Sequence, residues 1–321
     1  MTNVAITGAG GYIAGQLISF LNNKKWCRSI IGTDIVTPKF KSDKLVFYPN
    51  DIRDPGLFDL WPGDKIDVLV HLAFIVDPIH DEKKMYDVNV NGTRNVLQVC
   101  DKFNIPHVIV ASSGTAYGAW PDNPPALKED DPIRTFPPSF NYAHHKGLVE
   151  QDFATYIKAH PETIFNIVRP CVVYGPRTDN YLSRYLKNMP VIFLADGLDP
   201  DLQFVHEADV AALFSLLIEK KIPGAFNVAG DGVIKTSEIA AMIGKKTLKI
   251  PKKLYALLVR ILWHLHVKTV EAPAGCIDYT THPWVLDTTR AKNELGWQPR
   301  YNSNQALQIM LKTHGYQPGS I

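Results

Sequence analysis

The sequence predicts an α/β protein with a doubly wound parallel sheet and a smaller capping lobe. Short apolar runs alternate with helical stretches from "NVAIT" near the amino terminus to "FNIVRP" in the middle of the chain. Strands that alternate with helices form right-handed crossover units, which place parallel strands in one sheet with helices on both faces. With 321 residues, 45% of them hydrophobic, the chain is long enough to bury such a core.

The expected elements follow the chain in a simple order. The strand "NVAIT" leads into a helix over about residues 11–22, and the strands "SIIGTDI", "KLVFYPNDI" and "DVLVHLAF" come next. A helix over about residues 85–104 then precedes the strand "HVIVASS". Beyond "FNIVRP", proline and glycine become frequent and the elements shorten. We expect this later part to cap a substrate.

This change of character sets the expected domain boundaries. Residues 1–170 are predicted to form the sheet domain, to which 203–230 and parts of 276–295 return because segments such as "QFVHEADVAALFSLLIE" are apolar enough to join its core. Residues 171–202 and 231–321 are predicted to form the substrate-binding lobe.

The charge and cysteine content exclude several classes of protein. The 34 Lys and Arg nearly balance the 32 Asp and Glu, so the net charge of +2 does not indicate a nucleic-acid partner. The four cysteines lie far apart, which fits neither a disulfide framework nor a metal site. We expect no signal peptide, because the first strand begins at Asn3, and no membrane span. We therefore expect a cytoplasmic protein.

A glycine-rich turn after the first strand is a candidate phosphate-binding site. Gly8 and Gly11 have the spacing of a dinucleotide fingerprint, with Ala14 in the third position. Glycines let the backbone approach a pyrophosphate, and the start of the next helix, at Tyr12 and Ile13, offers unpaired N–H groups to it.

Asp34, at the end of "IIGTDI", is the candidate that selects the cofactor. A carboxylate at the end of the second strand accepts hydrogen bonds from the adenosine ribose and repels a 2′-phosphate. This position favours NAD over NADP. The alternative is that Asp34 only begins a turn.

Several ordered motifs resemble the extended short-chain dehydrogenase/reductase family, which includes the NAD-dependent epimerases and dehydratases. The motifs are "TGAGGYIAG", "HLAF", "NVNGTRNVL", "SSGTAYG", "YAHHK", "RPCVVYGP", "QFVHEADVA" and "DTTRAKNELGWQP", and they span almost the whole chain. The resemblance implies a Rossmann-type NAD-binding domain. It adds these residues to the expected cofactor site: Asp51 and Ile52 beside the adenine ring, Leu72 and Ala73 at a strand end, the structural Asn89, and Val172.

The same resemblance implies the catalytic residues Ser113, Tyr142 and Lys146, with Ser112 as the alternative serine. Tyr142 and Lys146 are four residues apart and so share one helix face. By resemblance, Tyr142 exchanges a proton with the substrate, Lys146 stabilises its phenolate and grips the nicotinamide ribose, and Ser113 bonds the reacting oxygen. A free phenol has a pKa of about 10, so a nearby ammonium is needed for it to act as a base.

Two histidines lie between the tyrosine and the lysine. A metal site is one interpretation of His144 and His145, but neighbouring residues point to different helix faces and no further ligands adjoin them. We expect both histidines to be exposed to solvent.

Other positions depart from the nucleotide-sugar enzymes of the family. Val172 stands where they carry Asn, Gln203 or its neighbour stands where they carry Arg, and no Arg directly precedes Asp287. Gly114-Thr115 replaces the Asp-Glu pair of the sugar dehydratases, which argues against dehydration by that route.

Residues 219–268 are strongly basic, with ten Lys or Arg against three Asp or Glu, which indicates either an anionic substrate or a solvated basic face. Within them, residues 252–266 form an apolar helix with basic flanks. This pattern favours packing on the domain or on a partner over contact with a membrane.

By resemblance, a homodimer is expected through the helices that begin near Val88 and Tyr142.

Three functions are compatible with these features. The first is an NAD-dependent oxidoreductase that transfers hydride reversibly at a secondary alcohol or ketone of a small molecule. The second is a nucleotide-sugar 4-epimerase of the UDP-sugar type, which returns the hydride to the same carbon. The third is a non-catalytic dinucleotide sensor, and the intact serine, tyrosine and lysine argue against it.

Overall fold

The computed structural model describes residues 1–59 and 65–316. Its main sheet has seven parallel strands in the order β11-β6-β5-β4-β1-β2-β3. The strands are β1 (Thr2–Thr7), β2 (Cys27–Asp34), β3 (Leu45–Pro49), β4 (Val68–His71), β5 (His107–Ala111), β6 (Ile164–Pro170) and β11 (Gly224–Val228). The predicted doubly wound α/β fold is confirmed.

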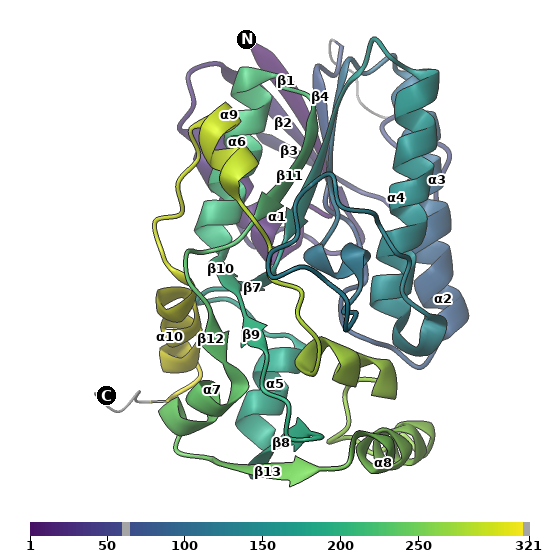
Figure 1. Ribbon diagram of the computed structural model, residues 1–321. Coiled ribbons are helices and arrows are strands. Elements are labelled where there is room, and N and C mark those ends of the chain that lie inside the picture. The colour runs from purple at the N-terminus through teal and green to yellow at the C-terminus, as the bar shows by residue number, and fades with distance from the viewer. Residues whose placement is uncertain (60–64, 317–321) are drawn as a thin grey trace.

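Helices cover both faces of this sheet (Figure 1). On one face, α1 (Tyr12–Asn22) packs against α6 (Glu207–Lys220), and α9 (Thr289–Leu295) packs against α6 and β11. On the other lie α2 (Glu82–Tyr86), a π-helical turn, η1 (Asp87–Asn91), α3 (Gly92–Lys102) and α4 (Asn141–Ala159). The expected helix over about residues 85–104 is thus a shorter helix and a longer one joined by the π-turn.

The alternation of side chains along the strands fills two hydrophobic cores. In β1, Val4 and Ile6 face the core that includes Leu17 of α1, while Ala5 faces the core that includes Val96 of α3. All five are buried. A strand that is buried on both faces must be apolar throughout, which explains the continuous apolar runs of the sequence.

Smaller elements form the capping lobe at the carboxyl ends of the sheet strands (Figure 1). Three two-stranded sheets pair β7 (Val172–Tyr174) with β10 (Phe204–His206), β9 (Asp201–Leu202) with β12 (Ile234–Lys235), and β8 (Val191–Ala195) with β13 (Lys246–Ile250). The helices of this lobe are α5 (Tyr181–Asn188), α7 (Thr236–Met242), α8 (Lys252–His264) and α10 (Ser303–Thr313). The 3₁₀ turns in the described ranges are η2 (Gly114–Tyr117) and η3 (Pro138–Phe140), both between β5 and α4, and η4 (Ala274–Thr280). None of the helices in the described ranges is long and apolar enough to cross a bilayer.

The strand order reverses between β1 and β4, which predicts a ligand crevice beyond their carboxyl ends. The chain continues from β1 to β2 and β3 on one side and to β4, β5 and β6 on the other. Ligands of open parallel sheets bind at such a reversal, outside the carboxyl ends of the strands. The expected domain boundaries stay a prediction, although β11 and α6 do return to the main sheet.

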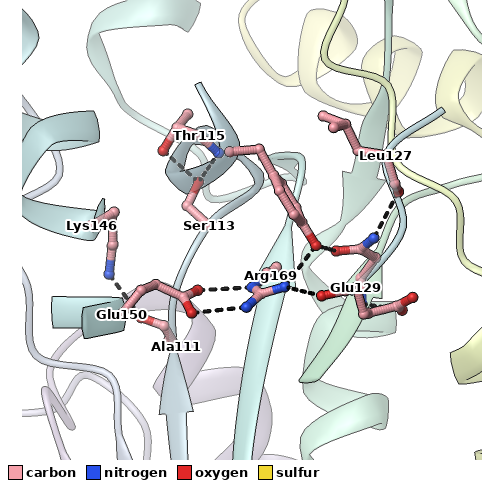
Figure 2. Close-up of polar contacts among 10 residues, drawn as sticks. Ala111, Ser113, Thr115, Leu127, Glu129, Lys146, Glu150 and Arg169 are labelled. Atoms are coloured by element: carbon pink, nitrogen blue, oxygen red, sulfur yellow. Dashed lines mark hydrogen bonds and ion pairs between the residues drawn. The ribbon is translucent and has the colours of Figure 1, made fainter. Parts of the chain in front are cut away.

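A buried ion pair connects the sheet to α4. Arg169 of β6 donates from Nε and Nη2 to the Glu150 carboxylate at 2.8 and 2.9 Å, and both side chains are almost fully buried. Arg169 Nη1 donates to the Tyr117 hydroxyl at 2.7 Å and to the Glu129 carbonyl at 3.0 Å (Figure 2). Tyr117 in turn donates to Asn227 of β11 at 2.9 Å.

We predict that Glu150→Gln destabilises the protein by about 3–5 kcal/mol, because it leaves the Arg169 guanidinium buried without its counter-charge. The matched control is Asp152→Asn, two residues away on α4, which breaks the solvent-exposed pair with Arg94. Its expected cost is below about 1 kcal/mol. Urea unfolding gives both free energies, and equal losses would contradict the prediction.

Candidate active site

The glycine turn after β1 lies against the end of β4. Gly8 has a φ of +72°, and a Cβ on it would lie 2.5 Å from the backbone nitrogen of Ala73. Only glycine fits that contact. α1 begins at Tyr12 without a side-chain cap, so its first N–H groups have no partner within the helix. This turn therefore fits the pyrophosphate of a dinucleotide.

Asp34 is fixed at the edge of the same turn. Its carboxylate accepts hydrogen bonds from the N–H groups of Gly10 and Val36, both at 2.9 Å. A Cβ on Gly10 would lie 2.6 Å from the Val36 carbonyl oxygen, so this glycine is also required. The sequence-based prediction did not single out Gly10, although the "GAGG" motif contains it. The geometry fits a carboxylate that binds the adenosine ribose.

Other predicted cofactor residues are held by the protein itself. Asp51 binds Arg53, whose guanidinium lowers the pKa of that carboxyl, and the next residue, Ile52, is buried. Asn89 is fully buried in the π-turn. Its side-chain amide accepts a hydrogen bond from the Ile75 N–H at 2.7 Å and donates one to the Ile75 carbonyl at 3.0 Å. Asn89 thus fixes the loop after β4.

Three further predicted residues lie at strand ends. The backbone N–H of Leu72 donates to the Thr7 carbonyl. The next residue, Ala73, packs its backbone against Gly8. Val172 begins β7, half-buried, and pairs with Phe204 of β10. The ends of β1 and β4 therefore meet, and Val172 borders the capping lobe.

Ser113, Tyr142 and Lys146 come together beyond the end of β5. Lys146 is buried, and its Nζ donates to the Ala111 carbonyl at 2.7 Å (Figure 2). The same Nζ lies 3.4 Å from the centre of the Phe74 ring and 5.7 Å from that of Tyr142. The Phe74 ring also packs edge-on against the Tyr142 ring at 5.8 Å and so joins Tyr142 to Lys146, while the Ser113 side chain lies close enough to Tyr142 to lower the pKa of its phenol.

Thr115 sets the direction of the Ser113 hydroxyl. Ser113 Oγ accepts from the Thr115 N–H at 3.1 Å and from Thr115 Oγ1 at 2.9 Å (Figure 2). With both lone pairs used, the single Ser113 proton is free to donate toward the Tyr142 side. The alternative, Ser112, is buried and its hydroxyl has no partner among the described residues. The sequence indicated that Thr115 replaces a dehydratase acid, but not this role.

Burial shifts the pKa values of Tyr142 and Lys146 in opposite directions. It raises the pKa of the Tyr142 phenol to about 12, and the hydrogen bond from Ser113 partly offsets this rise. Burial lowers the pKa of the Lys146 ammonium to about 7, against a smaller opposing effect of Glu150. Each charge is disfavoured alone, so a phenolate and an ammonium in this pocket favour each other.

A buried histidine that the sequence analysis did not identify locks the strand ends together. His71 ends β4, where Nδ1 lies 2.7 Å from Thr7 Oγ1 and Nε2 lies 3.0 Å from Thr93 Oγ1. Burial lowers the pKa of His71 to about 3, so the ring is neutral. The "HLAF" motif contains this residue, but its partners are far away in the sequence.

The expected exposure of the two neighbouring histidines is wrong for His145. His145 is buried and packs edge-on against Tyr86 at 5.4 Å, because this face of α4 meets α2. His144 is half-buried and bonds the Phe136 carbonyl at 2.7 Å. No group of three His, Cys, Asp or Glu within the described ranges could hold a metal ion.

Gln203 has a structural use. Its side chain accepts from the Leu286 N–H at 2.7 Å and donates to the Leu286 carbonyl at 3.3 Å. It therefore joins the segment before β10 to the segment that precedes Asp287.

A glycine turn at a strand-order reversal, beside a serine, tyrosine and lysine cluster, defines a dinucleotide-dependent enzyme of the doubly wound class. Residues 4–229 match the model of the "NAD dependent epimerase/dehydratase family". The chain belongs to this family, so it is an enzyme that uses NAD.

Curated relatives include three mycobacterial proteins. The one from Mycobacterium bovis, described as uncharacterized, is 26% identical, and the match covers 98% of this chain and 85% of that protein. The putative UDP-glucose 4-epimerase of Methanocaldococcus jannaschii is 28% identical over 65% of this chain and 70% of its own. An Escherichia coli 4-epimerase of an undecaprenol-diphosphate-linked sugar is 28% identical over 58% of this chain and 54% of its own.

Solved structures share the fold. The UDP-glucose 4-epimerase of Thermotoga maritima with UDP-glucose has a TM-score of 0.73 at 18% identity, over 98% of each chain. The dTDP-glucose 4,6-dehydratase of Bacillus anthracis with NAD has a TM-score of 0.72 at 18% identity, over 98% of this chain and 96% of its own.

We predict that Gly8→Ala weakens NAD binding at least about tenfold, because the added methyl group displaces the Ala73 backbone from the turn. Gly232→Ala is the matched control: its φ is +81°, but nothing lies within 4 Å of the added carbon. This control carries the backbone strain without the clash. Isothermal calorimetry with NAD measures both, and equal affinities would refute the role of Gly8.

Proposed function

We propose that this enzyme transfers hydride reversibly at a secondary alcohol or ketone, with Tyr142 as the acid and base. The observation that carries the proposal is the position of Tyr142 beside the buried Lys146 ammonium, whose Nζ lies 5.7 Å from the centre of the Tyr142 ring. Bound NAD supplies the acceptor and donor of the hydride. A carbonyl oxygen placed between the Ser113 hydroxyl and the Tyr142 phenol receives two hydrogen bonds and then the phenolic proton.

The protein's own groups prepare this proton transfer. With a pKa raised to about 12, Tyr142 holds its proton at neutral pH and is ready to donate it to a carbonyl oxygen. In the opposite direction the phenolate must form, and the ammonium of Lys146 stabilises it. Because Ala111 takes only one of the three Lys146 donors, two are left for the phenolate and for a ribose hydroxyl of the cofactor.

The anchoring of these groups keeps their spacing. Lys146 is fixed by the Ala111 carbonyl at the end of a sheet strand, and Ser113 is fixed by Thr115 in η2. Preorganised donors of this kind need no rearrangement during the reaction. A sensor that only binds a dinucleotide has no use for such an aligned proton donor.

A second candidate is a nucleotide-sugar 4-epimerase, and the epimerase relatives favour it. In this cycle the keto intermediate turns over in the pocket and the hydride returns to the same carbon. The departures at Val172 and Gln203 argue against the usual phosphate contacts, and the Gln203 amide is occupied by the Leu286 backbone. A homodimer through α3 and α4 and a cytoplasmic location stay predictions.

We predict that Tyr142→Phe lowers turnover by about 10²–10⁴-fold while NAD binding is retained, because only the transferable proton is removed. Tyr156→Phe is the control on the same helix: it removes a hydroxyl that bonds Asp101, away from the crevice, and turnover should persist. Activity is followed by NADH absorbance with a panel of sugar nucleotides and simple secondary alcohols. Full activity of Tyr142→Phe would disprove the acid and base assignment.

The retention of cofactor separates the two reactions. An oxidoreductase must exchange NAD(H) in each cycle, so we predict that the dialysed protein loses its dinucleotide and binds NAD(H) reversibly. Mass spectrometry of the denatured protein measures what is retained. About one NAD per chain after extensive dialysis would instead favour the epimerase cycle, and NADP would contradict the role of Asp34.

A further inference from the structure

The helix α8 stands at the outer edge of the capping lobe, beside β13 (Figure 1). Its inner face is half-buried: Tyr255 lies 5.2 Å from the Phe193 ring, and Trp263 lies 3.9 Å from the His80 ring. None of the helix residues is fully buried. The helix is therefore attached along one side only.

The opposite face of α8 is apolar and exposed. Its residues recur every three or four positions and share an arc of about 140° at 3.6 residues per turn. Between 37% and 69% of each is exposed, and the residues are Leu254, Leu257, Leu258, Ile261, Leu262 and Leu265. Such a contiguous stripe normally faces a core, so its exposure indicates an interaction surface. The sequence pattern favours packing on the domain or on a partner, and in the structure this stripe does not pack on the domain.

Cations lie along one border of the stripe, and acids are absent from this stretch of sequence. Residues 245–268 contain seven Lys or Arg and no Asp or Glu. Lys253 and Arg260 lie along one border of the stripe and are exposed, and the preceding strand, β13, carries the exposed Lys246 and Lys249. Neither Lys253 nor Arg260 forms a salt bridge within the described parts of the chain. The face is apolar in the middle and positive along one border.

We infer that α8 docks on an anionic lipid surface, with its leucines among the acyl chains and its cations at the headgroups. An amphipathic helix with a basic border binds such a surface by apolar burial together with electrostatic attraction. A second copy is a poorer occupant. A two-fold contact joins the same patch of each subunit, so it would supply no acidic group to the basic border.

The attachment of α8 connects this surface to the crevice. α8 packs on η4, and η4 packs on η3, which directly precedes α4, the helix that carries Tyr142. A cavity of about 330 Å³ lies at the carboxyl end of α8, lined by Trp263 and His266 and by Pro78 and His80 of the loop after β4. Docking through α8 would therefore hold the capping lobe at the membrane surface. This inference does not depend on which reaction the enzyme catalyses.

Vesicle flotation with the full chain tests the inference. The wild type should float with phosphatidylcholine vesicles that contain about one-third phosphatidylglycerol, and much less with phosphatidylcholine alone. Leu257→Gln with Ile261→Gln should reduce the bound fraction on anionic vesicles at least about tenfold. Lys253→Gln with Arg260→Gln should remove most of the preference for anionic lipid.

The matched control is Val46→Gln with Val233→Gln, which removes two exposed apolar side chains far from α8 and should bind vesicles as the wild type does. Thermal unfolding and NAD binding verify that each variant is folded. Absence of wild-type binding to anionic vesicles, or equal binding after Leu257→Gln with Ile261→Gln, would overturn the inference. So would light scattering that shows a wild-type oligomer which those two substitutions dissociate, because the stripe would then be a contact between copies.

Discussion

The buried contact between Arg169 and Glu150 is the constraint on which the active site depends. Glu150 lies one helical turn beyond Lys146 and two turns beyond Tyr142 on α4. Because Arg169 holds the Glu150 carboxylate, α4 can neither slide along its axis nor rotate about it. The same guanidinium holds the Tyr117 hydroxyl, and Tyr117 ends the turn that follows Ser113. One side chain thus sets the distance between the elements that carry the proposed proton donor and its serine partner. A charged pair suits this purpose because its donors and acceptors impose direction, which apolar packing does not.

The same burial gives the site its electrostatic character. The Lys146 ammonium is fixed by one carbonyl and an aromatic ring and lacks a directly bonded carboxylate among the described residues, since Glu150 is bound to Arg169. Its positive charge is therefore available to a neighbouring anion. His71 adds no competing charge, because burial keeps it neutral while its two ring nitrogens hold the ends of β1 and α3. The surroundings of Lys146 thus favour one transient ion pair, between the Lys146 ammonium and a Tyr142 phenolate.

The sequence was sufficient for the features that depend on local pattern. Alternating runs predicted the parallel sheet, and the fold places Gly8 and Asp34 at the carboxyl ends of β1 and β2 and the Lys146 ammonium at the end of β5. Contacts between distant segments could not be predicted in this way. Tyr117 meets Asn227 from 110 residues away, and a single sequence contains no sign of that contact. His145 was misjudged for the same reason, since the helix that covers it lies elsewhere in the chain.

The structure of the capping lobe is harder to predict, because the same sequence pattern there is compatible with two different roles of a residue. The family resemblance places Gln203, or its neighbour, at the position of an arginine. Both polar atoms of the Gln203 amide bond the Leu286 backbone, and an arginine could not accept the Leu286 N–H. The leucines of α8 follow a spacing that serves equally for a helix in a core and for a helix on a membrane. Only the position of the neighbouring elements separates these cases. The proposed chemistry thus rests on residues at the ends of the sheet strands, which local patterns predict, whereas the proposed membrane contact rests on residues of the capping lobe whose exposure only the fold reveals.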